Sequence, residues 1–136
     1  MVYLELGDLI VIAMAVLELE VDPLLHITDL GLADSALARP QASFEGTDFY
    51  PDMLGKAASL LYGVAKNHAF LDGNKRIAVM ATLQFLNLND YDLDLEPPGE
   101  ANEVISGVAG GEVELEELKV WMEKRLIEPD GHDATT

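Results

Sequence analysis

The sequence of 136 residues contains no cysteine, which excludes disulfide bonds, thiolate catalysis and zinc or iron clusters held by sulfur. Its longest uninterrupted apolar run, residues 9–17, is much shorter than the roughly 20 residues that a membrane-spanning helix requires. The first residues carry no basic cluster, so no secretory signal is expected. These absences predict a protein of the reducing cytoplasm with no membrane partner.

Positive charge is also scarce, because 8 lysines and arginines stand against 25 acidic residues and the formal net charge is −17. Such a balance opposes binding to a polyanion, since proteins that bind nucleic acids need a positive surface. No nucleic acid is therefore expected as a direct partner. The acidity itself has two interpretations, which are solubility in a salty cytoplasm and attraction to a basic protein partner.

Apolar residues make up 49% of the chain, which is enough for the core of one domain. Their spacing predicts an all-α domain of about six helices over residues 1–127, followed by a polar tail, residues 128–136, that we expect to be disordered. We expect helices that Asp8 and Asp34 cap, the second ending before Pro40. The other expected helices cover residues 53–67, 74–87, 100–109 and 115–126, with a solvated connection at residues 90–96.

One segment departs from the acidic composition of the chain. Only Asp72 is acidic between Met53 and Asn89, although 25 of the 136 residues are aspartate or glutamate. The segment nevertheless holds half of the basic residues, which are Lys56, Lys66, Lys75 and Arg76. Burial of two central helices explains about half of this depletion of carboxylates, but it does not explain the cations.

The stretch NHAFLDGNKR, residues 67–76, connects these two central helices. A helix that begins at Asn74 directs unpaired backbone N–H groups and the positive end of its dipole into the connection. Gly73 lets an anion approach the backbone closely. Lys75 and Arg76 lie in the first helical turn, where cations are unfavourable unless an anion binds. The pattern therefore predicts a phosphate-binding site.

Three further side chains of the connection have both a structural and a chemical interpretation. Asp72 is either a helix cap or a ligand of Mg²⁺, with polyphosphate oxygens and water completing the octahedron. His68 is either a C-terminal helix cap or a base that takes a proton from an attacking hydroxyl. Phe70 is an apolar anchor. Together with the phosphate-binding groups, these residues supply the parts that phosphoryl-type transfer requires.

The connection resembles the signature His-x-Phe-x-(Asp/Glu)-(Gly/Ala)-Asn-(Gly/Lys)-Arg of the Fic/Doc family. The matching residues are His68, Phe70, Asp72, Gly73, Asn74, Lys75 and Arg76. Further similarity runs through residues 31–52 and 86–94. Lysine at the position where most Fic enzymes carry glycine resembles the Doc (death on curing) branch, whose members are toxins of toxin–antitoxin modules. The resemblance implies the Fic/Doc fold, with the motif between its two central helices.

The resemblance also implies roles for the matching residues. His68 is the implied base that deprotonates the target hydroxyl, and Asp72 the implied ligand of Mg²⁺ on the phosphates of ATP. The implied phosphate-binding residues are Gly73, Asn74, Lys75 and Arg76, and Phe70 packs inward.

A short β-hairpin flap that aligns the target segment is a further implication of the family. We place it between Gln41 and Tyr50, and its residues are Ser43, Phe44, Glu45, Gly46 and Thr47. The residues alone predict only an extended pair around a turn, between the helix breakers Pro40 and Pro51.

Members of the Doc branch bind ATP in reversed orientation and transfer its γ-phosphate to a threonine of elongation factor Tu. The resemblance therefore implies a kinase toxin that arrests translation, with a separate antitoxin bound in a groove beside the nucleotide site. Lys75 favours this activity, and so does Val79, where AMP-transferring enzymes carry a second arginine. Gly73 is shared with those enzymes, so AMP transfer is an alternative. A nucleotide- or partner-binding module without turnover is another.

Overall fold

The computed structural model describes residues 1–129, and within them it contains seven α-helices and two short antiparallel sheets. The helices are α1 (Leu6–Leu17), α2 (Val21–His26), α3 (Leu30–Ala38), α4 (Met53–Asn67), α5 (Asn74–Leu88), α6 (Pro98–Gly110) and α7 (Leu115–Glu123). The predicted helical fold is confirmed. The predicted tail lies outside the described residues from residue 130 on. No helix within residues 1–129 has the length and apolar character needed to cross a bilayer.

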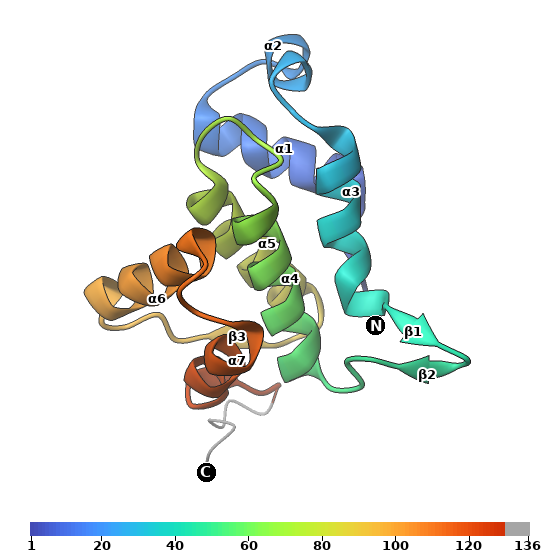
Figure 1. Ribbon diagram of the computed structural model, residues 1–136, viewed down its shortest axis with the longest axis vertical. Helices are drawn as coiled ribbons and strands as arrows, with labels where there is room; N and C mark the ends of the chain where they lie inside the picture. The colour runs from blue at the N-terminus through green and yellow to red at the C-terminus, as the bar shows by residue number, and fades with distance from the viewer. Residues whose placement is uncertain (130–136) are drawn as a thin grey trace.

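Helices α4 and α5 form an antiparallel pair at the centre, and α1, α3, α6 and α7 lie around it (Figure 1). Most of α4 is buried, because apolar and small residues cover nearly its whole circumference. Its N-terminus is capped by Asp52, whose Oδ1 accepts the N–H of Gly55 at 2.8 Å. Leu60, Ile77 and Phe85 are each at most 1% exposed and join the two helices in one core.

Two predicted caps differ from those in the structure. Asp8 lies in the first turn of α1, where its carboxylate accepts the N–H of Glu5 at 2.8 Å in a reciprocal capping box. The prediction that Asp34 caps a helix was wrong. Helix α3 begins earlier, because Asp29 accepts the N–H of Leu32 at 3.0 Å and so satisfies a free donor of the first turn.

Two elements do not follow from the periodicity of the sequence. Helix α2 has only 6 residues, too few to display a helical repeat. The last predicted helix ends early, because Leu126 belongs to β4 (Leu126–Ile127). That strand pairs with β3 (Asp92–Leu93), so the expected connection at residues 90–96 is in part a strand.

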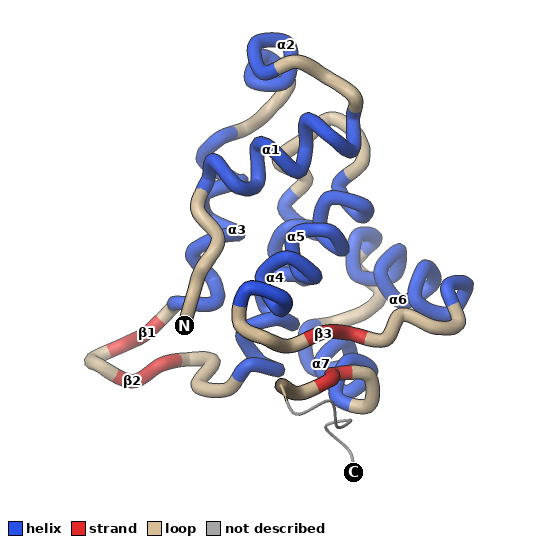
Figure 2. Tube along the Cα trace, turned by 180° about the vertical axis from the view of Figure 1, so that it is seen from behind, coloured by secondary structure: helices blue, strands red, loops and turns tan. Residues whose placement is uncertain are grey.

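The predicted hairpin is present between the 3₁₀ turn η1 (Arg39–Gln41) and α4. Strand β1 (Ser43–Phe44) pairs with β2 (Thr47–Asp48) in antiparallel register. Glu45 and Gly46 form the two-residue turn with φ angles of 52° and 81°, as the turns that suit a twisted hairpin require. Figure 2 shows the hairpin projecting from the start of α4. The strand residues are all exposed.

Candidate active site at the α4–α5 connection

The connection between α4 and α5 has a fixed path. Helix α4 ends at Asn67, and the left-handed φ of 53° at the next residue, His68, turns the chain away from the helix axis. The backbone then runs beside the α2–α3 connection, where the Asp29 N–H donates to the carbonyl of Ala69 at 2.7 Å and Thr28 forms a β-bridge with Phe70. Phe70 itself is 2% exposed and packs in the core. The loop is therefore fixed both by its backbone contacts with the α2–α3 connection and by the burial of Phe70.

Side chains of the motif line a cavity of about 510 Å³ between this connection and the end of α6. The lining residues from the connection are Leu71 and six motif residues, His68, Asp72, Gly73, Asn74, Lys75 and Arg76. The opposite wall consists of Ser106, Ala109 and Gly110. The structure thus brings together six of the seven motif residues around one cavity, and the seventh, Phe70, is buried in the core.

His68 is exposed, so its imidazole can meet a substrate from solvent. Its Nε2 lies 3.3 Å from the carbonyl oxygen of Ala109 in the last turn of α6. A carbonyl only accepts hydrogen bonds, so this contact is a hydrogen bond in the tautomer that carries the proton on Nε2, in which the lone pair of Nδ1 is free. The end of α6 therefore orients the imidazole. The residues of α6 belong to no motif, and only the folded structure reveals this role.

Asp72 is exposed at the rim of the same cavity. Its Oδ1 accepts the N–H of Gly73 at 2.7 Å, and Gly73 rather than Asp72 occupies the N-cap position of α5. Within residues 1–129 no group of three or more acidic, histidine or cysteine side chains is gathered for a metal ion. One aspartate suits Mg²⁺ only where phosphate oxygens and water supply the remaining ligands. The donor set fits a nucleotide-bound magnesium ion.

The first turn of α5 offers backbone donors to the cavity. The first intrahelical bond runs from the N–H of Ile77 to the carbonyl of Gly73 at 2.9 Å, so the N–H groups of Asn74, Lys75 and Arg76 have no partner within the helix. No acidic side chain lies in this turn. An anion is the complement that these donors and the helix dipole favour.

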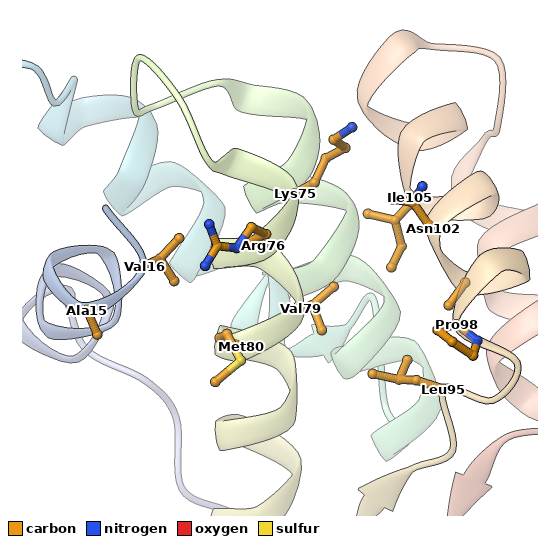
Figure 3. A pocket seen from close by; sticks show the side chains of 11 residues that line it. Ala15, Val16, Lys75, Arg76, Val79, Met80, Leu95, Pro98, Asn102 and Ile105 are labelled. Carbon is orange, nitrogen blue, oxygen red and sulfur yellow. The ribbon is translucent and has the colours of Figure 1, made fainter. Parts of the chain in front are cut away.

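Lys75 and Arg76 also line a second cavity, of about 650 Å³, between α1, α5 and α6. Its other walls are mainly apolar, with Val79, Met80 and Ile105 among them (Figure 3). In Figure 3 the Arg76 side chain points toward α1, whereas Lys75 reaches toward α6. The Lys75 Nζ donates to the Ser106 Oγ at 3.2 Å. The two cations therefore mark the boundary between an apolar groove and the cavity of the motif.

The hairpin is not gathered with the motif. It lies before the first residue of α4, whereas His68 follows the last (Figure 1). The 15 residues of α4 separate the two by about 22 Å at the usual helical rise. Any contact of the hairpin with a target is therefore distant from the imidazole.

Comparison with known proteins identifies relatives of this chain. The sequence profile described as Fic/DOC family matches residues 3–86, which include the whole motif. The protein named Toxin Doc of Mycolicibacterium smegmatis is 41% identical over 100 residues, covering 69% of this chain and 73% of that protein.

Proposed function

Because this chain belongs to the Fic/DOC family, we propose that it is a toxin of a toxin–antitoxin module that transfers the γ-phosphate of Mg·ATP to a serine or threonine hydroxyl of a translation factor, with elongation factor Tu as the expected target. Such transfer arrests translation and growth. One observation carries the proposal. An exposed imidazole, a carboxylate, unpartnered helix-start donors and two cations line a single cavity.

Each group has a place in the proposed reaction. The basic Nδ1 of His68 takes the proton of the target hydroxyl, whose oxygen attacks the γ-phosphorus. The bond from that phosphorus to the bridging oxygen breaks, and ADP leaves with the electron pair. The N–H groups of α5 and the Arg76 guanidinium hold the phosphate oxygens. Asp72 would hold the magnesium ion, which neutralises phosphate charge.

Transfer of the terminal phosphate is supported by the position of Lys75. Its amine reaches from α5 to Ser106 on α6 in the lining of the cavity, where a glycine would place no side chain. A cation there draws the polyphosphate chain toward itself and changes which phosphorus faces His68. Gly73 favours the alternative, AMP transfer, because AMP-transferring members of the family carry this residue.

The apolar groove between α1, α5 and α6 is the proposed site of a separate antitoxin. It shares Lys75 and Arg76 with the cavity of the motif, so a segment bound in it closes the phosphate site from the side. The relative from Mycolicibacterium smegmatis is named a toxin, and a toxin of this kind requires an antidote protein.

The hairpin is the proposed aligning element for the target. With Phe44 65% exposed and Phe49 60% exposed, it offers apolar surface at the far end of α4. A target held there and at His68 would be fixed at two points about 22 Å apart.

Radiolabelled ATP and a cell lysate test the activity. Label at the γ position is expected on a target protein, with a mass increase of about 80 Da, whereas AMP transfer retains an α label and adds about 329 Da. His68→Ala should lower labelling by ~10²–10⁴-fold, as loss of a general base does. His26→Ala is the matched control, because His26 is an exposed histidine on α2. Equal labelling by wild type and His68→Ala would exclude the proposed reaction, and ATP binding without any labelling would indicate a module without turnover.

A further inference from the structure

Ser106 lies in α6, outside the motif, and it lines the cavity that holds His68 and Asp72. Its Oγ accepts the Nζ–H of Lys75 at 3.2 Å, so this contact links α6 to the first turn of α5. Lys75 lines both the cavity of the motif and the apolar groove, whereas Ser106 lines the cavity of the motif. The hydroxyl is therefore available to a ligand that meets the imidazole.

The hydroxyl proton of Ser106 is free to bind such a ligand. An ammonium group only donates hydrogen bonds, so Oγ is the acceptor in its contact with Lys75 and keeps its own O–H. Hydroxyls within helices often donate to a carbonyl of the preceding turn, as those of Ser59 and Thr82 do at 2.8 Å each. Within residues 1–129 the Ser106 O–H has no such acceptor. A hydrogen-bond donor thus remains at the wall of the cavity.

Lys75 is similarly free of an acidic partner. Within the described residues the single salt bridge joins Arg125 to Glu100, although the whole chain contains 25 acidic residues. The amine polarises the Ser106 hydroxyl, because a hydroxyl that accepts a hydrogen bond becomes a stronger donor. The amine and the hydroxyl together present two donors and one positive charge. A phosphate oxygen is the acceptor that suits them.

The place of Ser106 on α6 indicates which phosphate it meets. Ala109, whose carbonyl oxygen lies 3.3 Å from Nε2 of His68, follows Ser106 by three residues on the same helix. Residues three apart lie on one face of a helix, about 4.5 Å from each other along its axis. The hydroxyl is therefore about one helical turn from the contact of the imidazole. A phosphate that it binds is the one beside the reacting oxygen.

We infer that Ser106 is a further ATP-binding residue, whose hydroxyl donates to an oxygen of the phosphate that is transferred while Lys75 contacts the same group. In the proposed reaction this is the γ-phosphate, held between α6 and the backbone donors of α5. The inference rests on the proposed function and adds a contact from outside the motif. Because ADP lacks the γ-phosphate, this contact distinguishes ATP from ADP.

Calorimetric titration with Mg·ATP and with Mg·ADP tests the contact in the absence of a target protein. Ser106→Ala should weaken ATP binding about tenfold, as loss of a hydrogen bond to a charged group does, and should change ADP binding by less than about twofold. Ser106→Thr keeps the hydroxyl and should restore most of the ATP affinity. Ser35→Ala is the matched control, because Ser35 is an exposed serine on α3. The urea midpoint of Ser106→Ala should not fall, since alanine favours a helix.

Lys75→Met tests whether the amine and the hydroxyl act as a pair. In this background Ser106→Ala should weaken ATP binding less than it does in the wild type, because the hydroxyl has already lost the donor that orients it. Additive effects of the two substitutions would overturn the joint contact.

Equal affinities of the wild type and Ser106→Ala for Mg·ATP would overturn the inference and leave the proposed function standing. An equal loss of affinity for ATP and ADP would also overturn it, because the hydroxyl would then contact a phosphate other than the terminal one. If the wild type binds Mg·ATP but labels no protein in the lysate, the proposed function fails, and the same titrations still decide the role of Ser106. A wild type that binds neither nucleotide would overturn both.

Discussion

The side-chain amide of Asn74 hydrogen-bonds both backbone polar groups of Phe70. The Phe70 N–H donates to Oδ1 at 3.1 Å, and Nδ2 donates to the Phe70 carbonyl at 2.7 Å. Asn74 is 8% exposed, so water cannot readily replace these bonds. The amide thus ties the anchored part of the loop to the first turn of α5, and only the backbone N–H of Asn74 remains for a phosphate.

Asn74→Ala should therefore destabilise the fold by about 1–3 kcal/mol, because it leaves a buried N–H and a buried carbonyl without partners. Urea denaturation followed by circular dichroism measures the loss as a lower midpoint at an unchanged slope. Asn87→Ala, at an exposed position of the same helix, should change the free energy of unfolding by less than about 0.5 kcal/mol. Equal effects of the two substitutions would show that the amide does not fix the loop.

Gly73→Ala should be destabilising for two separate reasons. The φ of Gly73 is +72°, which costs a residue with a side chain about 1–2 kcal/mol. In addition, a Cβ at this position would lie 2.8 Å from Cδ2 of Leu17 in α1. Thermal unfolding of Gly73→Ala should therefore show a larger decrease in the midpoint temperature than the positive φ alone would cause.

Gly111→Ala separates these two causes. Gly111 has a similar φ of +87°, but a Cβ there would meet no atom within 4 Å. Gly111→Ala should lower the free energy of unfolding only by the amount that the positive φ causes. Gly73→Ala should lower it further. In the Gly73→Ala background, Leu17→Ala should lower the free energy of unfolding by less than it does in the wild type, since the smaller side chain removes the crowding. Additive effects of the two substitutions would contradict a contact between them.

The central pair of helices could be predicted from the sequence, because their apolar residues repeat over a long stretch. The predicted bounds 53–67 agree with α4, and the predicted end at residue 87 misses that of α5 by one residue. The residues of the motif are close in the chain, so one connection brings them together. Contacts with distant segments could not be predicted in this way. Ala109 and Ser106 reach the site through the packing of α6, which no local pattern encodes.

For the hairpin, the local structure could be predicted from the sequence, but its position relative to the motif could not. Its position between Pro40 and Pro51 was predicted correctly, and its two-residue turn follows from Gly46. Its distance from His68 depends on the length and direction of α4, which is a property of the tertiary structure. The contact of the Arg39 guanidinium with the Tyr62 ring could not be predicted either, because it joins η1 to α4 and appears only after folding.

Tyr62→Phe should lower the pKa of Lys66 toward its ordinary value, because the hydrogen bond from the amine to the hydroxyl is the largest cause of its raised pKa. A raised pKa in the folded state stabilises the fold fully below the unfolded value of about 10.4, and this contribution is lost as pH rises through the folded pKa. The wild type should thus lose more stability than Tyr62→Phe in alkaline solution. NMR titration of the Lys66 side chain measures the shift, with Lys124 as the reference amine. An unchanged Lys66 titration in Tyr62→Phe would contradict the role of the hydroxyl.

Arg76→Ala should weaken ATP binding by roughly 1.5–3 kcal/mol, the usual contribution of a hydrogen bond to a charged group. Arg76 lies in the first turn of α5 and lines both cavities, so its guanidinium is the cation that a phosphate chain at this helix start would meet. Calorimetric titration with Mg·ATP measures the change, and the same titration with ADP tests whether the lost contact is to the terminal phosphate. Lys124→Ala removes an equal charge from an exposed position and should leave the affinity unchanged, which separates a direct contact from the effect of net charge. If both substitutions reduced the affinity equally, Arg76 would act only through the net charge of the protein. The phosphates would then have to be held by the backbone donors alone.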